Sequence, residues 1–342
     1  MSLFLFTFNC AKVPQSKFQD LNPILPSTPP NLLIFGFQEL VPILESTIPH
    51  KVNEELLRIN DHIHNVLVQK YGDNLIHTVE IHHMGGIGMI LMSLNPTRIL
   101  NLKKGFTSCG ILYSSLKGGI GLRFNYLDQE YTFVVAHLSA NEGQVERRNQ
   151  DSWKILKNIE FNDDWSVLKP GVHTYFMGDL NYRKAIYGDE LSKQINDGEA
   201  FPGFIEEDLN FEPTYKFHIG SDDYNTKRIS SWCDRILYLK HEDEEQADKP
   251  IYDSIPSFKT SDHKPVYLNI SLPKILPKDI IDSRGYLINS DIYLKSTSLS
   301  KLNNFLMILG DLIIGSTLTL VGTPWGYFVL ICLILAFIFW LF

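Results

Sequence analysis

The stretch that decides the fold is residues 231–238, which read Ser-Trp-Cys-Asp-Arg-Ile-Leu-Tyr. Its first half is polar and turn-like, and its second half continues into a short apolar run of β-forming side chains. Asp234 therefore sits at the mouth of a buried strand, where a carboxylate is partly removed from water and still reaches a neighbouring side chain. An aspartate in such a position orients a histidine. Taken alone, the stretch fits a strand-entry Asp234–Arg235 pair without chemistry equally well.

Polar side chains recur at the ends of the other predicted strands. Apolar, strand-like segments fall at residues 3–8, 32–37, 87–92, 119–126, 131–137, 173–177, 236–239 and 266–270, and helical spacing at 54–71 and 146–159. The polar residues at these strand ends are Asn9, Glu39, His137, Asp179, Asn181, Asp234, Asp262 and His263. Any one of them is more often a cap or turn residue. Their joint placement predicts two packed sheets with outer helices and polar ends converging at one edge.

The composition narrows the class of protein. A chain of 342 residues is long enough for one large domain, and its net charge of -8 argues against a general nucleic-acid binder. A local basic pocket for a phosphate substrate remains compatible with that balance. The four cysteines are far apart and lack metal-ligand spacing, which favours reduced thiols in a cytosolic setting. The apolar N-terminus lacks a basic region and a cleavage site, so no secretory signal is predicted.

The polar set is rich in oxygen donors and free of sulfur, which favours Mg²⁺ or Mn²⁺ over zinc. We expect Mg²⁺ with Glu39 as its direct ligand, supported by Asn9 and Asp262. Hydrolysis of a phosphate ester further needs a held water and positive charge on the phosphate oxygens.

The remaining polar residues are assigned to catalysis. Asp179 is expected to hold the attacking water, and Asn181 to donate to a phosphate oxygen without adding charge. His263, oriented by Asp234, acts as an acid/base or phosphate-contacting group near neutral pH, and His137 is a second phosphate contact. No cysteine or serine stands in a nucleophile arrangement, so direct attack by water is preferred.

Two long motifs carry a family resemblance. Residues 176–183, Phe-Met-Gly-Asp-Leu-Asn-Tyr-Arg, and residues 231–238 resemble the two signature motifs of inositol polyphosphate 5-phosphatases, which belong to the endonuclease/exonuclease/phosphatase superfamily. Shorter matches at 7–9, 36–39, 117–119, 137–138, 147–150, 213–217 and 261–263 follow in the family's order. The resemblance spans roughly residues 3–272. It implies a four-layered α/β sandwich of two mixed, mostly antiparallel sheets flanked by helices, and Mg²⁺-dependent removal of an inositol 5-phosphate.

The resemblance also implies substrate contacts. Tyr215 and Lys216 match the element that touches the inositol 4-phosphate, and Lys117 matches the loop that approaches the 1-phosphate. Lys227 and Arg228 lie in the basic segment before the second motif and would add positive charge for a vicinal bisphosphate. A solvated loop pair is the alternative for these two residues.

Three positions depart from the family pattern. Asn141 stands where the family often has a second histidine, and we assign it a substrate contact by hydrogen bonding. Ser230 replaces a proline before the second motif, and Thr226 replaces a lysine. These changes bear on preference among inositol phosphates, whereas every predicted catalytic residue is retained.

The chain changes character after residue 272. We divide it into a catalytic domain at 1–272, a linker at 273–311 with room for an interfacial helix, and a membrane anchor at 312–342 whose core span is 325–342. No charged residue occurs from 312 to 342, and the last 18 residues are just long enough to cross a bilayer. A buried C-terminal core helix is the alternative. Such a tail anchor leaves the domain in the cytosol, and the layout resembles that of tail-anchored 5-phosphatases of the endoplasmic reticulum.

The predicted function is Mg²⁺-dependent hydrolysis of the 5-phosphate of phosphatidylinositol 4,5-bisphosphate, giving phosphatidylinositol 4-phosphate at a cytosolic membrane face. The predicted partner is a phosphoinositide lipid in the membrane, with no nucleic acid and no inferable protein partner. One alternative is another phosphodiesterase on the same scaffold, such as a neutral sphingomyelinase or a DNA-repair nuclease. The other is a phosphoinositide-binding tether without turnover.

Overall fold

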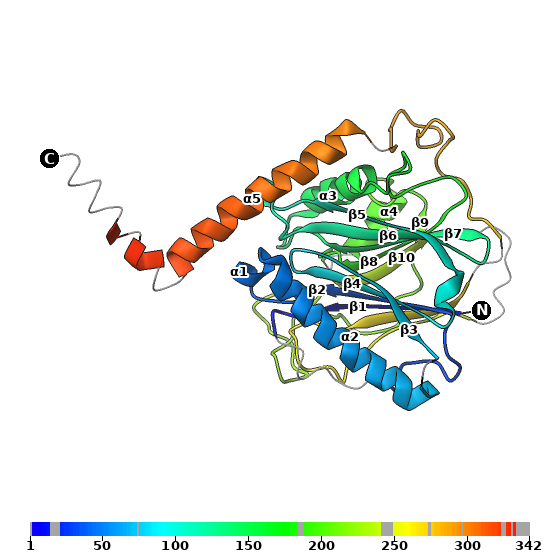
Figure 1. The fold of residues 1–342 in the computed structure, drawn as a ribbon, viewed down its shortest axis with the longest axis horizontal. Helices are drawn as coiled ribbons and strands as arrows, with labels where there is room; N and C mark the ends of the chain where they lie inside the picture. The colour runs from blue at the N-terminus through cyan, green and yellow to red at the C-terminus, as the bar shows by residue number, and fades with distance from the viewer. Residues whose placement is uncertain are drawn as a thin grey trace.

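Two mixed β-sheets face each other in the computed structural model of the chain (Figure 1). The structure describes residues 2–13, 21–73, 75–183, 188–240, 249–272, 275–295, 297–322, 326–329 and 331–332. Within these residues, the first sheet has the order β11-β12-β1-β2-β4-β3. Its strands are β1 (Ser2–Asn9), β2 (Leu32–Gln38), β3 (His77–Met84), β4 (Ile87–Ser93), β11 (Ile251–Ser254) and β12 (Val266–Ser271).

The second sheet has the order β5-β6-β7-β8-β10-β9 among the described residues. Its strands are β5 (Ile99–Ser108), β6 (Gly118–Tyr126), β7 (Gln129–His137), β8 (His173–Asp179), β9 (Phe204–Ile205) and β10 (Asp234–Leu239). Each sheet contains one parallel pair, β1 with β2 and β7 with β8, and its other pairs are antiparallel. The predicted pair of mixed, mostly antiparallel sheets is confirmed.

Helices cover both outer faces of the sandwich (Figure 1). The α-helices are α1 (Ile43–Ser46), α2 (Pro49–Tyr71), α3 (Val145–Asn158), α4 (Glu190–Asn196) and α5 (Ser298–Gly322), and the 3₁₀-helices are η2 (Pro96–Arg98) and η3 (Ile111–Tyr113). The apolar stripe of α2 packs on the first sheet, where Leu56, Ile59 and Ile63 are buried. Helices α3 and α4 pack on the second sheet. A third apolar cluster fills the space between the sheets, so the chain has four layers.

Strand pairing places the predicted polar residues at one end of this sandwich. Asn9 ends β1, His137 ends β7, and Asp179, which ends β8, pairs in register with both His137 and Asp234. Side chains alternate between the two faces of a strand. Because Leu5, Val135, Met177 and Ile236 point into the space between the sheets, their same-face neighbours Asn9, His137, Asp179 and Asp234 finish that inner layer with polar groups.

The structure adds strands that the pattern analysis did not identify. The first of them is β3, which lies at the edge of the first sheet and carries His82 and His83. The strand escaped notice because its sequence, His-Thr-Val-Glu-Ile-His-His-Met, is half polar and only partly buried. Strands β5, β9 and β11 were missed as well, and each contains either several polar residues or too few residues for a periodic signal.

The segment after β12 covers part of the domain. Ile281 and Leu294 are buried in the cluster on the outer face of the second sheet, and α5 then follows. Across the described ranges, no helix combines the length and the apolar character that crossing a membrane requires. The predicted span at 325–342 lies largely outside the described residues and stays a prediction.

Candidate active site

A pocket of about 160 Å³ opens at the polar end of the sandwich. It is lined by Asn9, Lys12, Glu39, Lys117, His137, Ala140, Asn141, Asp179, Asn181, Arg183, Tyr215, Lys216, Asp262 and His263. Residues from distant parts of the chain meet here, as the convergence of strand ends predicted. Among the predicted site residues, Asp234 lies directly behind the pocket, whereas Lys227 and Arg228 do not line it.

Asp179 reaches the pocket because of the residue before it. Gly178 has a φ of +144°, and a Cβ there would overlap the carbonyl oxygen of Ala136 on the neighbouring strand. Only glycine adopts this conformation without penalty. The sequence Gly-Asp thus fixes where the carboxylate leaves β8.

The carboxylate of Asp179 is shared by several partners. Asn9 Nδ2 donates to Oδ2 over 2.8 Å, and His137 Nε2 lies 3.2 Å from the same oxygen. The backbone N–H of Asn181 donates to Oδ1 over 3.1 Å. Burial alone would raise the pKa of Asp179, but the positive charge of His263 and the hydrogen bond from His137 outweigh it and hold that pKa well below its usual value. Asp179 is therefore ionised at neutral pH and acts as a fixed acceptor.

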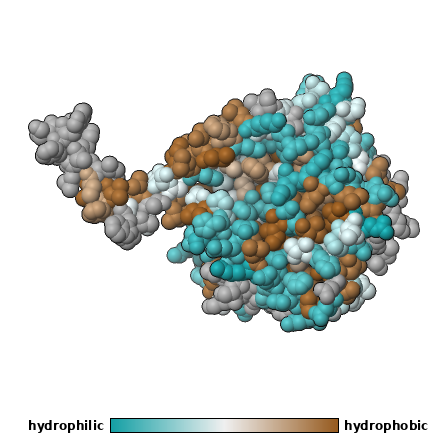
Figure 2. Space-filling view, viewed as in Figure 1, coloured by the Kyte–Doolittle hydropathy of each residue, from teal (hydrophilic) through white to brown (hydrophobic). Residues whose placement is uncertain are grey.

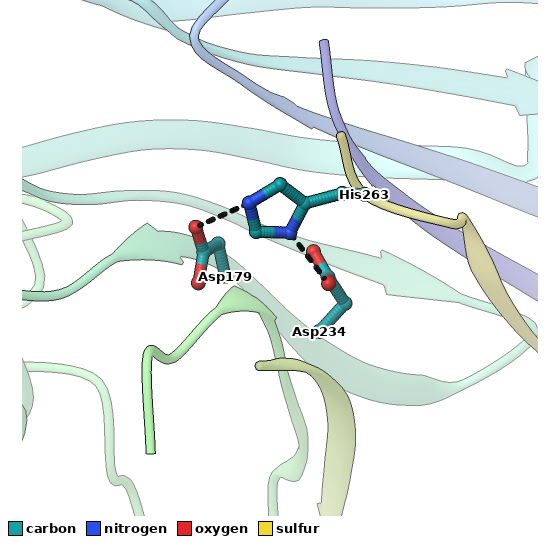
Figure 3. Close-up of side chains that lie close together, drawn as sticks. All are labelled: Asp179, Asp234 and His263. Atoms are coloured by element: carbon teal, nitrogen blue, oxygen red, sulfur yellow. Dashed lines mark hydrogen bonds and ion pairs between the residues drawn. The ribbon is translucent and has the colours of Figure 1, made fainter. Parts of the chain in front are cut away.

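Asp234 and His263 form an oriented pair (Figure 3). His263 Nδ1 lies 2.8 Å from Asp234 Oδ2, and its Nε2 lies 3.9 Å from Asp179 Oδ2. Thr214 Oγ1 donates to Asp234 Oδ2 over 2.7 Å, while Oδ1 is buried and has no hydrogen-bond partner among the described residues. Burial lowers the pKa of His263, but Asp234 and Asp179 outweigh it and raise that pKa to about 9. The imidazolium faces the pocket with a positive charge near neutral pH.

A second group of charges lines the opposite side of the pocket. Lys12 Nζ lies 2.8 Å from Glu39 Oε2, and Glu39 Oε1 lies 4.0 Å from His137 Nε2. Lys117 Nζ contacts His137 Nε2. Burial lowers the pKa of Lys117 to about 8, and burial together with the charge of Lys117 lowers the pKa of His137. His137 is thus the neutral histidine of the site and His263 the charged one.

The donor set fits a hard divalent cation. Glu39, Asn9 and Asp262 bring carboxylate and amide oxygens to the same pocket, and none of the described residues that line it carries sulfur. Among the described residues, Asp179, Asp234 and His263 form a group that could hold a metal ion, with ligand atoms within 4.8 Å of one another. The oxygens of Glu39 and Asp179 flank His137, so the metal site expected at Glu39 adjoins this group.

Three polar residues of the site adopt a left-handed backbone conformation. The φ angle is +49° at Glu39, +58° at Asn181 and +78° at Asn141. Such a conformation costs non-glycine residues on the order of 1 kcal/mol, and it persists where surrounding contacts determine it. Here those contacts include Asn181 Nδ2, which donates to the carbonyl oxygen of Leu138 over 3.1 Å.

The predicted 4-phosphate element also borders the pocket. The Tyr215 ring lies 4.6 Å from the His263 ring, and Lys216 Nζ lies 2.7 Å from Asp262 Oδ2. Asp262 therefore positions Lys216, a predicted substrate-binding residue, and is itself a predicted metal ligand. Lys227 and Arg228 are exposed on a neighbouring loop. Burial lowers the pKa of Lys216, but the ion pair with Asp262 outweighs both burial and the charge of Arg228 and raises that pKa.

The structure reveals three site residues that sequence reasoning left out. Arg183 donates to Asn181 Oδ1 over 2.6 Å and lies over the Tyr215 ring, so it orients both. Thr214 holds Asp234, and Lys12 pairs with Glu39. Arg183 and Thr214 lie inside the motifs at 176–183 and 213–217, which gave a signal that was not used. Lys12 had no signal beyond its distance of three residues from Asn9.

The four-layered fold and a carboxylate–histidine centre at one end of it define the class of protein. A family profile described as "Endonuclease/Exonuclease/phosphatase family 2" matches residues 6–188 and 184–269. The chain belongs to the endonuclease/exonuclease/phosphatase family.

Curated relatives narrow the resemblance. The type IV inositol polyphosphate 5-phosphatase 11 of Arabidopsis thaliana is 34% identical over 187 residues, which cover 48% of this chain and 55% of that protein. The phosphatidylinositol 4,5-bisphosphate 5-phosphatase INP51 of Saccharomyces cerevisiae is 32% identical over 210 residues, 54% of this chain and 22% of that protein. The predicted resemblance to inositol polyphosphate 5-phosphatases, a family of phosphoric monoester hydrolases, is confirmed. The matched region spans about half of the plant protein and about a fifth of the yeast one.

A solved structure supports the fold. The inositol polyphosphate 5-phosphatase domain of SPsynaptojanin, in complex with inositol (1,4)-bisphosphate and a calcium ion, has a TM-score of 0.69 and 21% sequence identity, covering 94% of this chain and 93% of that one. The likeness extends over both sheets and their helices, so the layered arrangement described above is that of a known phosphatase domain.

Proposed function

We propose that this chain is a Mg²⁺-dependent phosphoinositide 5-phosphatase that converts phosphatidylinositol 4,5-bisphosphate to phosphatidylinositol 4-phosphate by direct attack of water. The observation that carries the proposal is Asp179, an ionised carboxylate placed between Asn9, His137 and His263 at the centre of the pocket. Relatives named as 5-phosphatases, one of them for this lipid, support the choice of substrate.

Each polar group has a role in the displacement. Asp179 accepts a hydrogen bond from the attacking water and orients it toward phosphorus. His263, held by Asp234, directs positive charge at a non-bridging phosphate oxygen, and Asn181 and His137 contact the other oxygens. As the new oxygen–phosphorus bond forms, the bond between phosphorus and the inositol 5-oxygen breaks. The attacking water releases one proton and the inositol 5-oxygen takes one up, so one water is consumed for each phosphate released.

The metal and the ring phosphates complete the proposal. Glu39, supported by Asn9 and Asp262, would hold Mg²⁺, which when bound neutralises charge on the transferred phosphoryl group. Lys216 and Tyr215 would contact the 4-phosphate, and Lys117 the 1-phosphate. Asn141, Lys227 and Arg228 would extend the contact surface outward.

Phosphate release from vesicles tests the function. The full chain is incubated with phosphatidylcholine vesicles containing phosphatidylinositol 4,5-bisphosphate, with Mg²⁺ or with EDTA, and the product is identified by ring position. Mg²⁺-dependent formation of the 4-monophosphate is expected. Loss of a different ring phosphate, or cleavage of sphingomyelin or DNA in place of the monoester, would overturn the substrate assignment.

We also propose that the apolar C-terminal residues 325–342 anchor the chain in a membrane, the endoplasmic reticulum by resemblance, with the domain in the cytosol. The support is the sequence itself, which has no charged residue after position 311. Extraction of membranes from cells that express the chain distinguishes the outcomes. Retention in the pellet at pH 11 is expected, and release into the supernatant would contradict the anchor.

A further inference from the structure

A second cavity adjoins the catalytic pocket and has different chemistry. It measures about 490 Å³, within the range of ligand sites, and its walls are mostly apolar. One wall is the C-terminal helix α5, through Ile314 and Leu318, and the facing wall includes Leu112 of η3 and Val41. We call this cavity the α5 groove. The catalytic roles assigned above do not explain why the α5 groove is lined mostly by apolar side chains.

The α5 groove opens directly onto the catalytic pocket. Lys12, Glu39, Lys117 and His137 line both cavities. Lys117 is the residue assigned to the inositol 1-phosphate, and in a phosphoinositide that phosphate carries the glycerol and its acyl chains. A headgroup seated with its 1-phosphate at Lys117 therefore places the glycerol at the entrance of the groove.

Specific contacts hold α5 in place as a wall. Asn303 Nδ2 donates to Thr107 Oγ1 over 2.7 Å in a buried contact, and the N–H of Ser115 donates to Asp311 Oδ1 over 2.8 Å. Gly310 lies against the carbonyl oxygen of Leu112, where a Cβ would overlap that atom. These hydrogen bonds and the close approach at Gly310 fix the position of α5 on the domain. The α5 groove is therefore a defined part of the structure of the described residues.

The outer side of α5 is apolar as well (Figure 2). Phe305, Ile308 and Leu312 are 57%, 63% and 66% exposed, and Ile111, which lines the groove, is 82% exposed. Large exposed apolar surfaces of this kind mark contacts with protein or membrane. A helix that lies on a bilayer places its apolar side chains among the lipid acyl chains. The exposed apolar side of α5 and the α5 groove therefore favour the same ligand, a lipid.

We propose that the α5 groove binds an acyl chain of the lipid substrate, so that α5 makes the enzyme select phosphoinositides over soluble inositol phosphates. The inference rests on the proposed function and deepens it. A free inositol phosphate leaves the groove in contact with water, whereas an acylated substrate removes apolar surface of both partners from water. The binding energy gained in this way raises kcat/KM for the lipid alone.

The test compares two substrates that differ only in their acyl chains. The full chain, reconstituted in phosphatidylcholine nanodiscs, is assayed with dihexanoyl phosphatidylinositol 4,5-bisphosphate and with glycerophosphoinositol 4,5-bisphosphate. The measured quantity is the ratio of kcat/KM values, lipid over deacylated substrate. Ile314→Asn places a polar group in the groove and Thr317→Trp fills it, whereas Leu312→Asn makes a matched change on the outer side of the same helix.

Both groove variants should lower the ratio about tenfold, which corresponds to about two methylene groups no longer removed from water. The Leu312→Asn ratio should stay within about twofold of the wild type. An unchanged ratio in the groove variants, or an equal fall in all three variants, would overturn the groove as an acyl site. Higher activity of the groove variants on both substrates would also overturn it, since the chain's own apolar C-terminal residues would then occupy the groove. A wild type that cleaves neither substrate would refute the proposed function itself.

Discussion

Two neighbouring residues on β10 enter opposite environments. Asp234 points into the layer between the two sheets, beside His263, whereas Arg235 points to the outer face, toward the N-terminus of α4. Both side chains are fully buried, and both belong to the motif at 231–238. One strand thus carries two buried charges, and the comparison shows how a catalytic charge differs from a structural one.

The groups around Arg235 satisfy one another. Its guanidinium donates to both oxygens of Asp189, over 2.9 and 3.0 Å, and to both oxygens of Glu206. Asp189 also caps α4 by accepting from the N–H of Ser192 over 2.9 Å. Tyr252 adds a hydrogen bond to Glu206 over 2.6 Å. Each carboxylate oxygen of Asp189 and Glu206 accepts at least one hydrogen bond within the cluster, and the buried guanidinium is fully paired by the described residues.

The groups around Asp234 leave capacity unused. Within the part of the chain that the structure describes, Oδ1 of Asp234 has no hydrogen-bond partner, and burial raises the pKa of this carboxyl although His263 opposes it. His263 in turn presents Nε2 to the open pocket, 3.9 Å from the nearest oxygen of Asp179. Unsatisfied, mutually perturbed groups of this kind mark functional sites. The two clusters are therefore alike in burial and differ in whether their polar atoms have hydrogen-bond partners.

The largest effect is expected at Asp179. Asp179→Asn keeps the size of the side chain and removes its charge, so the water loses its acceptor and kcat should fall by about 10³-fold or more. The free energy of unfolding should also fall at neutral pH, because a carboxylate with a depressed native pKa contributes stability there and its loss leaves His263 with one opposing charge fewer. Phosphate release and urea unfolding of the same preparation measure the two quantities. Turnover close to that of the wild type would remove Asp179 from the reaction.

The reverse pattern is expected at Arg235. Arg235→Met leaves two acids buried without their partner, which should lower the free energy of unfolding by about 3–5 kcal/mol. The activity per folded molecule should change little, since this cluster faces away from the pocket. The triple variant Arg235→Met, Asp189→Asn, Glu206→Gln is the matched control and should recover part of the stability. No recovery would show that lost packing, and not unpaired charge, is responsible.

An intermediate effect on activity is expected at Asp234. Asp234→Asn leaves His263 without the charge that raises its pKa, so the histidine is less often protonated at neutral pH. The fall in kcat should be about 10²-fold at pH 7.5 and smaller at pH 6, where the imidazole is again charged. A pH profile of kcat parallel to that of the wild type would contradict the role of Asp234 in charging His263.

The smallest effect concerns pH and Asp189. Burial raises the pKa of this carboxyl, but Arg235 outweighs it and holds the pKa below its usual value. A depressed native pKa contributes stability above about pH 4, the unfolded value, and this contribution is lost as the pH falls through the native pKa. Asp189→Asn should therefore destabilise the chain more at pH 7 than at pH 3. Urea unfolding at both values checks this, and an equal loss at the two pH values would refute the linkage.

The sequence predicted much of the catalytic side of this comparison. Strand periodicity and the polar residues at strand ends brought Asn9, His137, Asp179 and Asp234 together, because alternation along a strand is a local rule. The saturated cluster escaped prediction, since Asp189 and Glu206 lie in irregular segments whose approach to Arg235 depends on tertiary packing. The same holds for Lys12 in the site and for the packing of α5 beside it. Local patterns indicate which face a residue occupies, and only the fold determines which distant segment meets it.

One paired measurement tests the central claim most directly. Release of 5-phosphate from phosphatidylinositol 4,5-bisphosphate and the free energy of unfolding are determined side by side for Asp234→Asn and Arg235→Met. We expect that Asp234→Asn loses most of its activity and keeps its stability, whereas Arg235→Met loses stability and keeps its activity per folded molecule. Activity and stability falling together in both variants would contradict the division of β10 into a catalytic and a structural face.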